Sequence, residues 1–170
     1  MAAVVVFESI YGNTREVANA VAAGLGGDTV VAAVGDVDEA ALTETELVVV
    51  GGPTHMHGLA TSMSRKMAVK GAEEDGDVEL DPAAKSERGV RDWLADLAGS
   101  GAAAAFDTRI DKSPALTGSA ARGIAKRLRR RGFSVVADPE SFFVDDAEGP
   151  LVEGELERAR EWGVSLRAKL

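Results

Sequence analysis

Short apolar runs alternate along the chain with stretches in which apolar residues recur every three or four positions. Such runs are typical of strands buried on both faces, and such spacing is typical of helices. The first run, Val4–Phe7, is followed by Val17, Val21 and Leu25 at four-residue spacing. The alternation predicts an α/β fold, a three-layer sandwich in which helices cover both faces of a doubly wound parallel sheet.

The apolar runs predict five parallel strands, the last of them resuming after a break: Val4–Phe7, Thr29–Val34, Glu46–Gly51, Ala102–Phe106, and Phe133–Ala137 with Ser141–Val144. The helical spacing predicts helices near Arg15–Leu25, Glu39–Thr43, Thr61–Val69, Gly89–Leu97, Ser119–Arg131 and Glu153–Leu170. At 170 residues, the length favours a single domain, residues 1–170.

A polar insertion at about 70–88 interrupts the third crossover and contains the acidic run Glu73–Asp77. Its composition predicts a solvated or disordered loop, and the alternative is a surface that docks a partner. We expect the insertion to contribute little to the core, so that shortening Gly71–Lys85 would leave folding intact.

The loop after the first strand joins a buried strand to an amphipathic helix and reads Ser9-Ile10-Tyr11-Gly12-Asn13-Thr14. Small and polar residues there leave backbone N–H groups free at a helix start, where the helix dipole favours an anion. The loop lacks the Lys of a Walker loop and the three glycines of a dinucleotide loop. Ser9, Asn13 and Thr14 are neutral donors suited to a terminal monophosphate. The alternative is a plain turn with Thr14 as helix N-cap.

Two further loops are expected at the same edge of the sheet, because ligands bind there beyond the carboxyl ends of the strands. One follows the third strand and offers flat or polarizable side chains to cover a ring: Gly52-Pro53-Thr54-His55-Met56-His57-Gly58. The other, Asp107–Leu116, offers charged and hydrogen-bonding groups for the opposite side or edge: Asp107, Thr108, Arg109 and Lys112. One phosphate loop and two ring loops predict a ligand the size of a mononucleotide.

Composition narrows the chemistry. The 19 Lys and Arg are outnumbered by 28 Asp and Glu, and the net charge of −9 argues against binding nucleic acid. Cysteine is absent, so redox chemistry would need a bound cofactor. His55 and His57 lack a third ligand, and no metal site is predicted. Because no stretch approaches membrane-spanning length and no leader is evident, we expect a cytoplasmic protein without membrane contact.

These motifs resemble the flavodoxin family, with the best segments similar to a bacterial branch of it. The family's phosphate loop has a Ser or Thr, any residue, Thr, Gly, any residue and Thr, and here Ser9, Gly12 and Thr14 match while Tyr11 departs. The resemblance implies that FMN binds through the three loops described above. It also implies that Arg109 runs along the pyrimidine edge of the flavin, where its charge would raise the two-electron potential. The alternative is an Arg109 that points to solvent or pairs with Asp107 or Asp111.

The resemblance implies an FMN-binding redox protein that transfers electrons through the isoalloxazine, with no side chain acting as a catalytic group. Its partner would be a redox protein with a basic surface or a small quinone-like acceptor. Tyr11 and the Gly-Gly-Pro-Thr string at 51–54 also occur in quinone-reductase relatives, so an NAD(P)H-dependent quinone reductase is the alternative. The absence of Trp and Tyr from the ring loops leaves open a flavin-free binding or scaffold module. The sequence predicts no oligomeric state.

Overall fold

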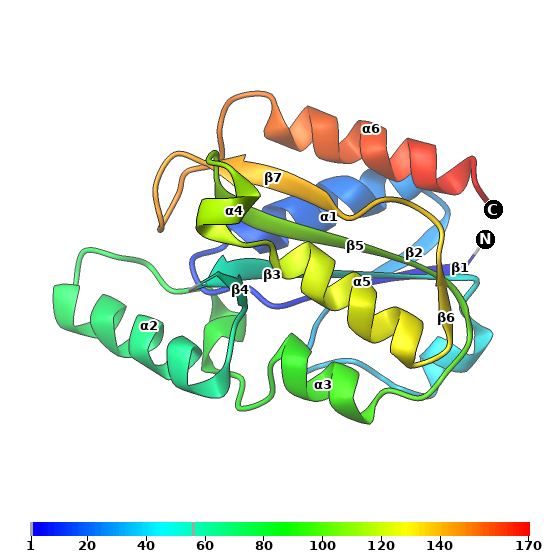
Figure 1. Ribbon diagram of the computed structural model, residues 1–170, viewed down its shortest axis with the longest axis horizontal. Coiled ribbons are helices and arrows are strands. Elements are labelled where there is room, and N and C mark those ends of the chain that lie inside the picture. The colour runs from blue at the N-terminus through cyan, green and yellow to red at the C-terminus, as the bar shows by residue number, and fades with distance from the viewer. Residues whose placement is uncertain (1, 56) are drawn as a thin grey trace.

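A computed structural model describes residues 2–55 and 57–170 and places a central sheet between helices (Figure 1). The described strands are β1 (Ala2–Phe7), β2 (Asp28–Ala33), β3 (Leu47–His55), β4 (Gly58–Leu59), β5 (Gly101–Ile110), β6 (Phe133–Val135) and β7 (Glu140–Val144). The order across the sheet is β2-β1-β3-β5-β6, and each neighbouring pair on this path is parallel. The predicted doubly wound sheet with five parallel strand positions is therefore confirmed.

The fifth strand position is filled by two strands in succession, as the predicted break indicates. β6 pairs with Gly101–Ala103 at the start of β5, whereas β7 pairs with Phe106–Ile110 at its end. The short β4 was not predicted. It turns back against the last residues of β3, so that His55 faces Gly58 in an antiparallel hairpin.

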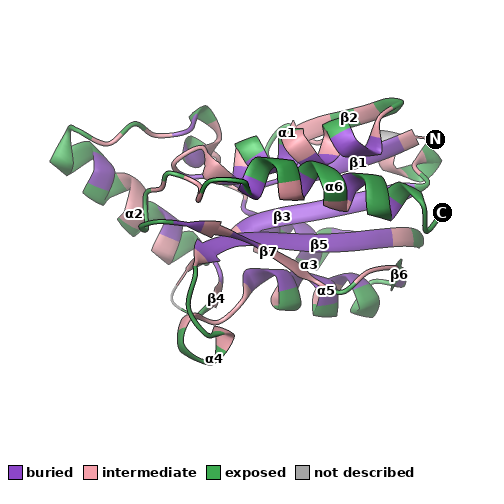
Figure 2. Ribbon diagram, turned by 90° about the horizontal axis from the view of Figure 1, so that it is seen from above, coloured by how far each residue is buried: buried purple, intermediate pink, exposed green. Residues whose placement is uncertain are grey.

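The helices form the outer layers: α1 (Asn13–Leu25), α2 (Ser62–Asp75), α3 (Val90–Asp96), α4 (Pro114–Thr117), α5 (Ala120–Arg130) and α6 (Glu155–Arg167), with 3-10 turns η1 (Ala41–Glu44) and η2 (Pro82–Lys85). Figure 2 shows α1 and α6 on one face of the sheet and α3 and α5 on the other. None of the described helices has the length and hydropathy needed to cross a bilayer.

Alternate side chains of the central strands feed two separate cores. Val4 and Val6 of β1 pack with α3 and α5, whereas Val5 and Phe7 pack with α1 and α6. Successive side chains of a strand point to opposite faces, so a strand buried on both faces needs a continuous apolar run. This requirement explains why β1 and β3 are rich in valine.

Gly51 makes room for a buried ring in the centre of the sheet. A Cβ atom at this position would lie 2.0 Å from the ring of Phe106 on the neighbouring β5. Phe106 is fully buried and forms edge-to-face pairs with Phe142 and Trp162, whose ring centroids lie 6.1 and 6.2 Å away. The glycine before the third-strand loop therefore has a packing role.

The prediction of a solvated or disordered loop at about 70–88 is wrong. Helix α2 continues to Asp75, and η2 forms at Pro82–Lys85. Between them Asp81 is 5 % exposed, and its backbone N–H donates to the Ile10 carbonyl at 2.7 Å. In the sequence, Asp81 reads as one more acid in a polar run, because its side-chain partner Arg15 lies 66 residues away.

Close helix packing around glycine generates a stability prediction. Where α1 and α6 cross, a Cβ atom at Gly163 would lie 2.2 Å from the Val21 carbonyl oxygen. Overpacking of this kind typically costs about 1–3 kcal/mol, more than the gain in helix propensity of about 1 kcal/mol. We expect Gly163→Ala to lower the free energy of unfolding by about 1–2 kcal/mol, measured by denaturant titration.

Gly71 in α2 is the matched control, because no heavy atom lies within 4 Å of a Cβ built there. Gly71→Ala should instead raise the free energy of unfolding by about 0.5–1 kcal/mol. Equal effects of the two substitutions would show that α1 and α6 do not pack through Gly163.

Candidate functional site

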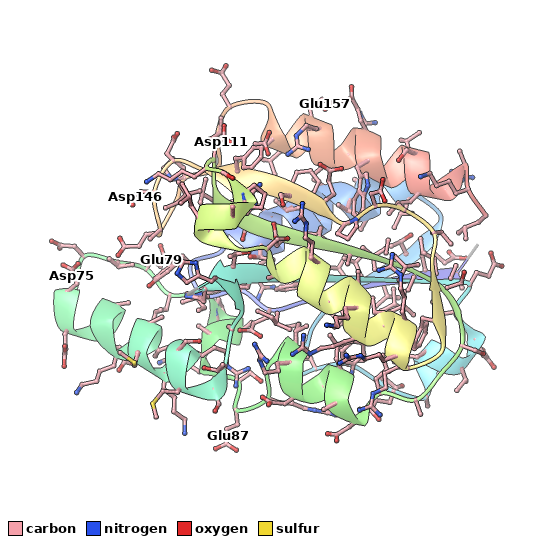
Figure 3. The ribbon with its side chains drawn as sticks, in the orientation of Figure 1. Asp75, Glu79, Glu87, Asp111, Asp146 and Glu157 are labelled. Atoms are coloured by element: carbon pink, nitrogen blue, oxygen red, sulfur yellow. The ribbon has the colours of Figure 1, made fainter. Side chains whose placement is uncertain are left out.

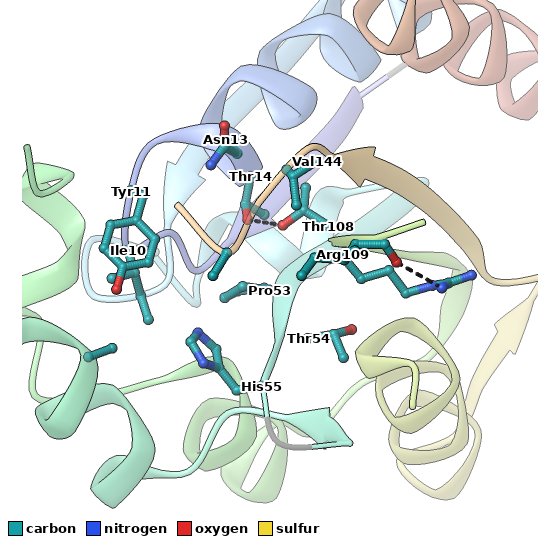
Figure 4. A pocket seen from close by; sticks show the side chains of 13 residues that line it. Ile10, Tyr11, Asn13, Thr14, Pro53, Thr54, His55, Thr108, Arg109 and Val144 are labelled. Carbon is teal, nitrogen blue, oxygen red and sulfur yellow. Dashed lines mark hydrogen bonds between the residues drawn. The ribbon is translucent and has the colours of Figure 1, made fainter. Parts of the chain in front are cut away.

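A cavity of about 380 Å³ opens at the carboxyl edge of the sheet, beyond β1, β3 and β5 (Figure 4). The strand order reverses between β1 and β3, which is where ligands bind in sheets of this kind. Its size lies within the range of small-molecule sites, roughly 300–1,000 Å³. The lining residues are Ile10, Tyr11, Asn13, Thr14, Pro53, Thr54, His55, Ala68, Thr108, Arg109, Ile110, Val144 and Ala147.

The cavity brings together residues from all three predicted loops: Ile10, Tyr11, Asn13, Thr14, Pro53, Thr54, His55, Thr108 and Arg109. His57 and Gly58 line a neighbouring cavity of about 260 Å³, which shares His55 with the first. Ser9, Gly12, Asp107 and Lys112 line neither. Met56, the remaining predicted residue, lies outside the described residues.

The first loop ends in a helix start that no side chain caps. Gly12 is the N-cap of α1 and has a φ of 95°, a conformation that favours glycine. The alternative in which Thr14 caps the helix is therefore wrong, because Thr14 already lies within the first turn. Backbone N–H groups of an uncapped first turn, together with the helix dipole, suit an anion.

The side chains of this loop are organised by protein partners. The Thr14 and Thr108 hydroxyl oxygens lie 2.8 Å apart, and either can be the donor. The Asn13 side-chain amide donates to the Glu148 carbonyl oxygen at 3.0 Å. Ser9 is fully buried and accepts a hydrogen bond from the Gly12 N–H at 3.1 Å. Thr14 and Asn13 thus reach the cavity, and Ser9 supports the loop from behind.

Asp81 holds the loop from the far side. Arg15 donates two hydrogen bonds to its carboxylate, at 2.8 and 2.6 Å, and the Ala83 N–H adds a third. Burial alone would raise the pKa of Asp81, but these bonds, with one from Ser9, lower it below its ordinary value. Arg15 also lies over the Phe7 ring, 4.8 Å from its centroid. The ion pair with Asp81 neutralises the charge of Arg15. The side-chain donors that the first loop presents to the cavity are therefore neutral.

Two flat side chains project into the cavity from different loops, Tyr11 and His55 (Figure 4). Burial, together with the nearby Glu148 carboxylate, raises the pKa of the Tyr11 hydroxyl. Burial lowers the pKa of His55, which keeps the imidazole neutral at pH 7. Tyr11 and His55 therefore give the cavity an uncharged aromatic wall. The ring loops contain no Trp or Tyr, and the first loop supplies Tyr11 instead.

The predicted loop at Asp107–Leu116 begins instead as strand, because β5 extends to Ile110. Asp107 is fully buried and accepts hydrogen bonds from the Thr54 hydroxyl at 3.0 Å, the Ser119 hydroxyl at 2.7 Å and the Ala121 N–H at 2.9 Å. These bonds fasten the start of α5 to β3 and β5. The sequence predicted the end of this strand at Phe106 because the polar Asp107 follows it. Hydrogen-bond partners inside the protein allow Asp107 to be buried within the strand.

Arg109 contributes to the cavity, but its guanidinium points away from Tyr11 and His55 (Figure 4). It donates to the Ser141 hydroxyl at 3.1 Å and to the backbone carbonyl of Lys112, and lies over the Phe143 ring at 5.0 Å. Arg109 is 8 % exposed. Its direct partners therefore belong to β7 and to the loop after β5, which Lys112 joins through its backbone. Its Nε also lies 4.0 Å from Asp107 Oδ1.

His57 lies at the tip of the β3–β4 hairpin with a φ of 74° and an exposed side chain. Over the described ranges, no three His, Asp or Glu side chains converge as a metal site requires.

Four cavity residues were not predicted: Ala68, Ile110, Val144 and Ala147. Val144 ends β7, and Ala147 lies in the loop after it. The edge rule that selected the other loops also applies to the strand predicted at Ser141–Val144, so this loop could have been found. Ala68 lies on α2 and carries no chemical signal in the sequence.

Comparisons with known proteins agree with this geometry. A sequence profile of the flavodoxin family matches residues 5–162, while curated protein sequences gave no match. An archaeal flavodoxin superposes with a TM-score of 0.67 at 23% identity, covering 99% of this chain and 98% of its own. For flavodoxin 2 from Bacillus cereus these values are 0.67 and 18%, covering 100% of both chains. For a WrbA-like flavodoxin from Agrobacterium tumefaciens they are 0.60 and 18%, covering 98% and 95%.

The Asp81 contacts predict an acid-sensitive stabilisation of the first loop. Because the pKa of Asp81 lies below its ordinary value of 3.8, its ionised form stabilises the fold above about pH 4. That contribution is lost as the pH falls through the folded-state pKa. Asp81→Asn should lower the free energy of unfolding by about 1–3 kcal/mol at pH 7, and the difference from wild type should shrink towards pH 3.

Asp77 supplies the control, since it belongs to the same acidic segment and is exposed. Asp77→Asn should change the free energy of unfolding by no more than about 0.5 kcal/mol. A pH-independent effect of Asp81→Asn would contradict the assigned role of its charge.

Proposed function

Since the chain belongs to the flavodoxin family, whose cofactor is FMN, we propose that it carries electrons between protein partners through FMN bound in the cavity. The bound flavin supplies the electron-transfer chemistry. The protein supplies the phosphate site, the orientation of the ring and limits on solvent access. No side chain is required as a catalytic acid or base.

The observation that carries this proposal is the uncapped start of α1 at the mouth of the cavity. The phosphate of FMN would lie against the first-turn N–H groups, with Thr14 and Asn13 as side-chain donors. Both hydroxyls of the Thr14–Thr108 pair can rotate, so Thr14 can turn its hydrogen towards a phosphate oxygen. These neutral donors can bind a charged phosphate oxygen, and they leave no unpaired cation in the loop when the phosphate is absent.

The rest of the cavity suits a flat, largely uncharged ring. Tyr11, Pro53 and His55 offer apolar or aromatic surface. Burial keeps His55 neutral, so the ring would meet no positive charge on that side. Asp107 and Asp81 lie outside the cavity and would act by fixing its loops.

Exposed acids surround the end of the molecule where the strands finish, among them Asp75, Glu79, Asp111 and Asp146 (Figure 3). Together with the net charge of −9, they would steer basic partner surfaces towards this end. A redox protein with a basic docking face is therefore the proposed partner. We place the protein in the cytoplasm, where chains without disulfides are usual.

An NAD(P)H-dependent quinone reductase is the second candidate, and Tyr11 at the cavity wall is the observation that favours it. Anaerobic mixing of the FMN-loaded protein with NADH or NADPH separates the two functions. Rapid bleaching of the flavin absorbance would assign the reductase, and a slow or absent reaction would support the electron carrier. A protein that takes up no FMN would instead indicate a binding or scaffold module.

The phosphate site predicts that FMN binds more tightly than riboflavin. A hydrogen bond to a charged group contributes roughly 1.5–3 kcal/mol, so Thr14→Ala should weaken FMN binding about ten-fold or more. Riboflavin, which lacks the phosphate, should bind wild type and variant alike. Quenching of flavin fluorescence during titration measures both affinities.

Thr43→Ala removes an exposed hydroxyl on η1 and should leave both affinities unchanged. Equal binding of FMN and riboflavin by the wild type would show that the first loop is only a helix start.

Arg109 predicts an electrostatic effect on the FMN potential that acts through space. Its buried cation would favour the negatively charged reduced ring, so Arg109→Ala should lower the two-electron midpoint potential. A shift of about 30 mV corresponds to roughly 1.4 kcal/mol, and we expect tens of millivolts in a spectroelectrochemical titration. Arg109→Lys retains the charge and should retain most of the potential. The same midpoint in the wild type and both variants would remove this role.

A further inference from the structure

Helix α5 carries a block of positive charge that contrasts with the rest of this acidic chain. Six basic residues and no acid occur between residues 122 and 131: Arg122, Lys126, Arg127, Arg129, Arg130 and Arg131. All of them are exposed except Arg127, which is half-buried. None takes part in an ion pair among the described residues. The block is therefore uncompensated within the described chain.

The helix dipole accounts for only part of this block. Cations in the last turn of a helix are stabilised by its dipole, and the effect falls off within that turn. Arg122 and Lys126 lie earlier in α5. Burial, with repulsion from Arg91 and Arg130, lowers the pKa of Arg127, whose guanidinium donates to the Gly123 carbonyl at 3.0 Å. The dipole favours Arg127, Arg129 and Arg130, which lie in the last turn, but no ion pair of the described residues offsets the repulsion among them.

Three of the six cations line a groove between α3 and α5. A cavity of about 250 Å³ between the two helices is bounded by Leu94 and Ala95 on one side and by Arg127, Arg130 and Arg131 on the other. Arg91 of α3 extends the basic surface towards the β3–β4 hairpin, where it donates to the Leu59 and Ala60 carbonyls. Figure 1 shows α3 and α5 side by side along one face of the sheet. We call this surface, Arg91 with Arg127, Arg130 and Arg131, the basic groove.

We propose that the basic groove is a docking surface for an acidic segment of a partner protein. Guanidinium groups present forks of N–H donors that match carboxylates in pairs, and several in a row read a series of Asp and Glu side chains. The acids at the cavity end and the basic groove give the molecule two faces of opposite charge. The two faces therefore suit two partners of opposite charge.

Nucleic acid fits the groove less well than an acidic protein segment. Single strands are usually held by exposed aromatic side chains. In α3 and α5 as described, the one aromatic residue is Trp93, which is fully buried.

The test uses a fluorescent peptide rich in glutamate as the probe and the change in its anisotropy on adding protein. The wild type should bind it at low salt, with affinity falling as salt rises from about 0.05 to 0.2 M. Arg127→Gln with Arg130→Gln should weaken binding about ten-fold. Lys66→Gln with Lys169→Gln removes the same charge from exposed positions elsewhere and should change affinity by less than about two-fold. None of these residues lines the FMN cavity, so the measurement is independent of flavin binding.

A charge-reversal variant shows whether a loss of peptide binding comes from the changed charge or from misfolding. Arg127→Glu with Arg130→Glu should reject the glutamate peptide and bind a matched lysine-rich peptide more tightly than the wild type does. The proposal is overturned if the glutamate peptide fails to bind the wild type, or if the control pair weakens it equally. Tighter binding of a matched single-stranded DNA, lost in the same Arg variants, would assign the groove to nucleic acid instead. Salt-dependent self-association lost in those variants would assign it to a second copy of the chain.

Discussion

Burial of both faces of the central strands is the constraint on which the rest of the structure depends. Val4 and Val6 meet one helical layer and Val5 and Phe7 the other, and β1, β3 and β5 run in parallel with helical crossovers that supply both layers. Parallel strands bring every strand end and every following helix start to one edge. The cavity, the uncapped start of α1 and the exposed acids around the cavity end therefore all lie at that edge.

Buried carboxylates convert this edge into a defined site. Asp107 joins β3, β5 and α5 through three hydrogen bonds, and Asp81 joins the first loop, α1 and the segment before η2. Each acts on the cavity from outside. The residues that line the cavity are mostly neutral, and the charges that fix them lie behind. This separation leaves room for a ligand that brings its own charge.

The sequence predicted what depends on local periodicity and missed what depends on distant partners. Strand positions and the α1, α3, α5 and α6 helices followed from apolar spacing, and nine cavity residues followed from the rule about strand ends. Asp81 looked dispensable because Arg15 is remote in the chain. β5 looked shorter because Asp107 is polar, yet its Oδ2 accepts three hydrogen bonds inside the protein. The short elements β4, α4 and η2 contain too few residues to show a period.

The most direct test of this account is a visible absorption spectrum of the purified protein after FMN is added and the excess removed, with identification of the flavin that denaturation releases. We expect equimolar FMN, a spectrum shifted from that of free FMN and quenched fluorescence. A colourless protein, or one that releases no FMN, would contradict the assignment of the cavity to this cofactor.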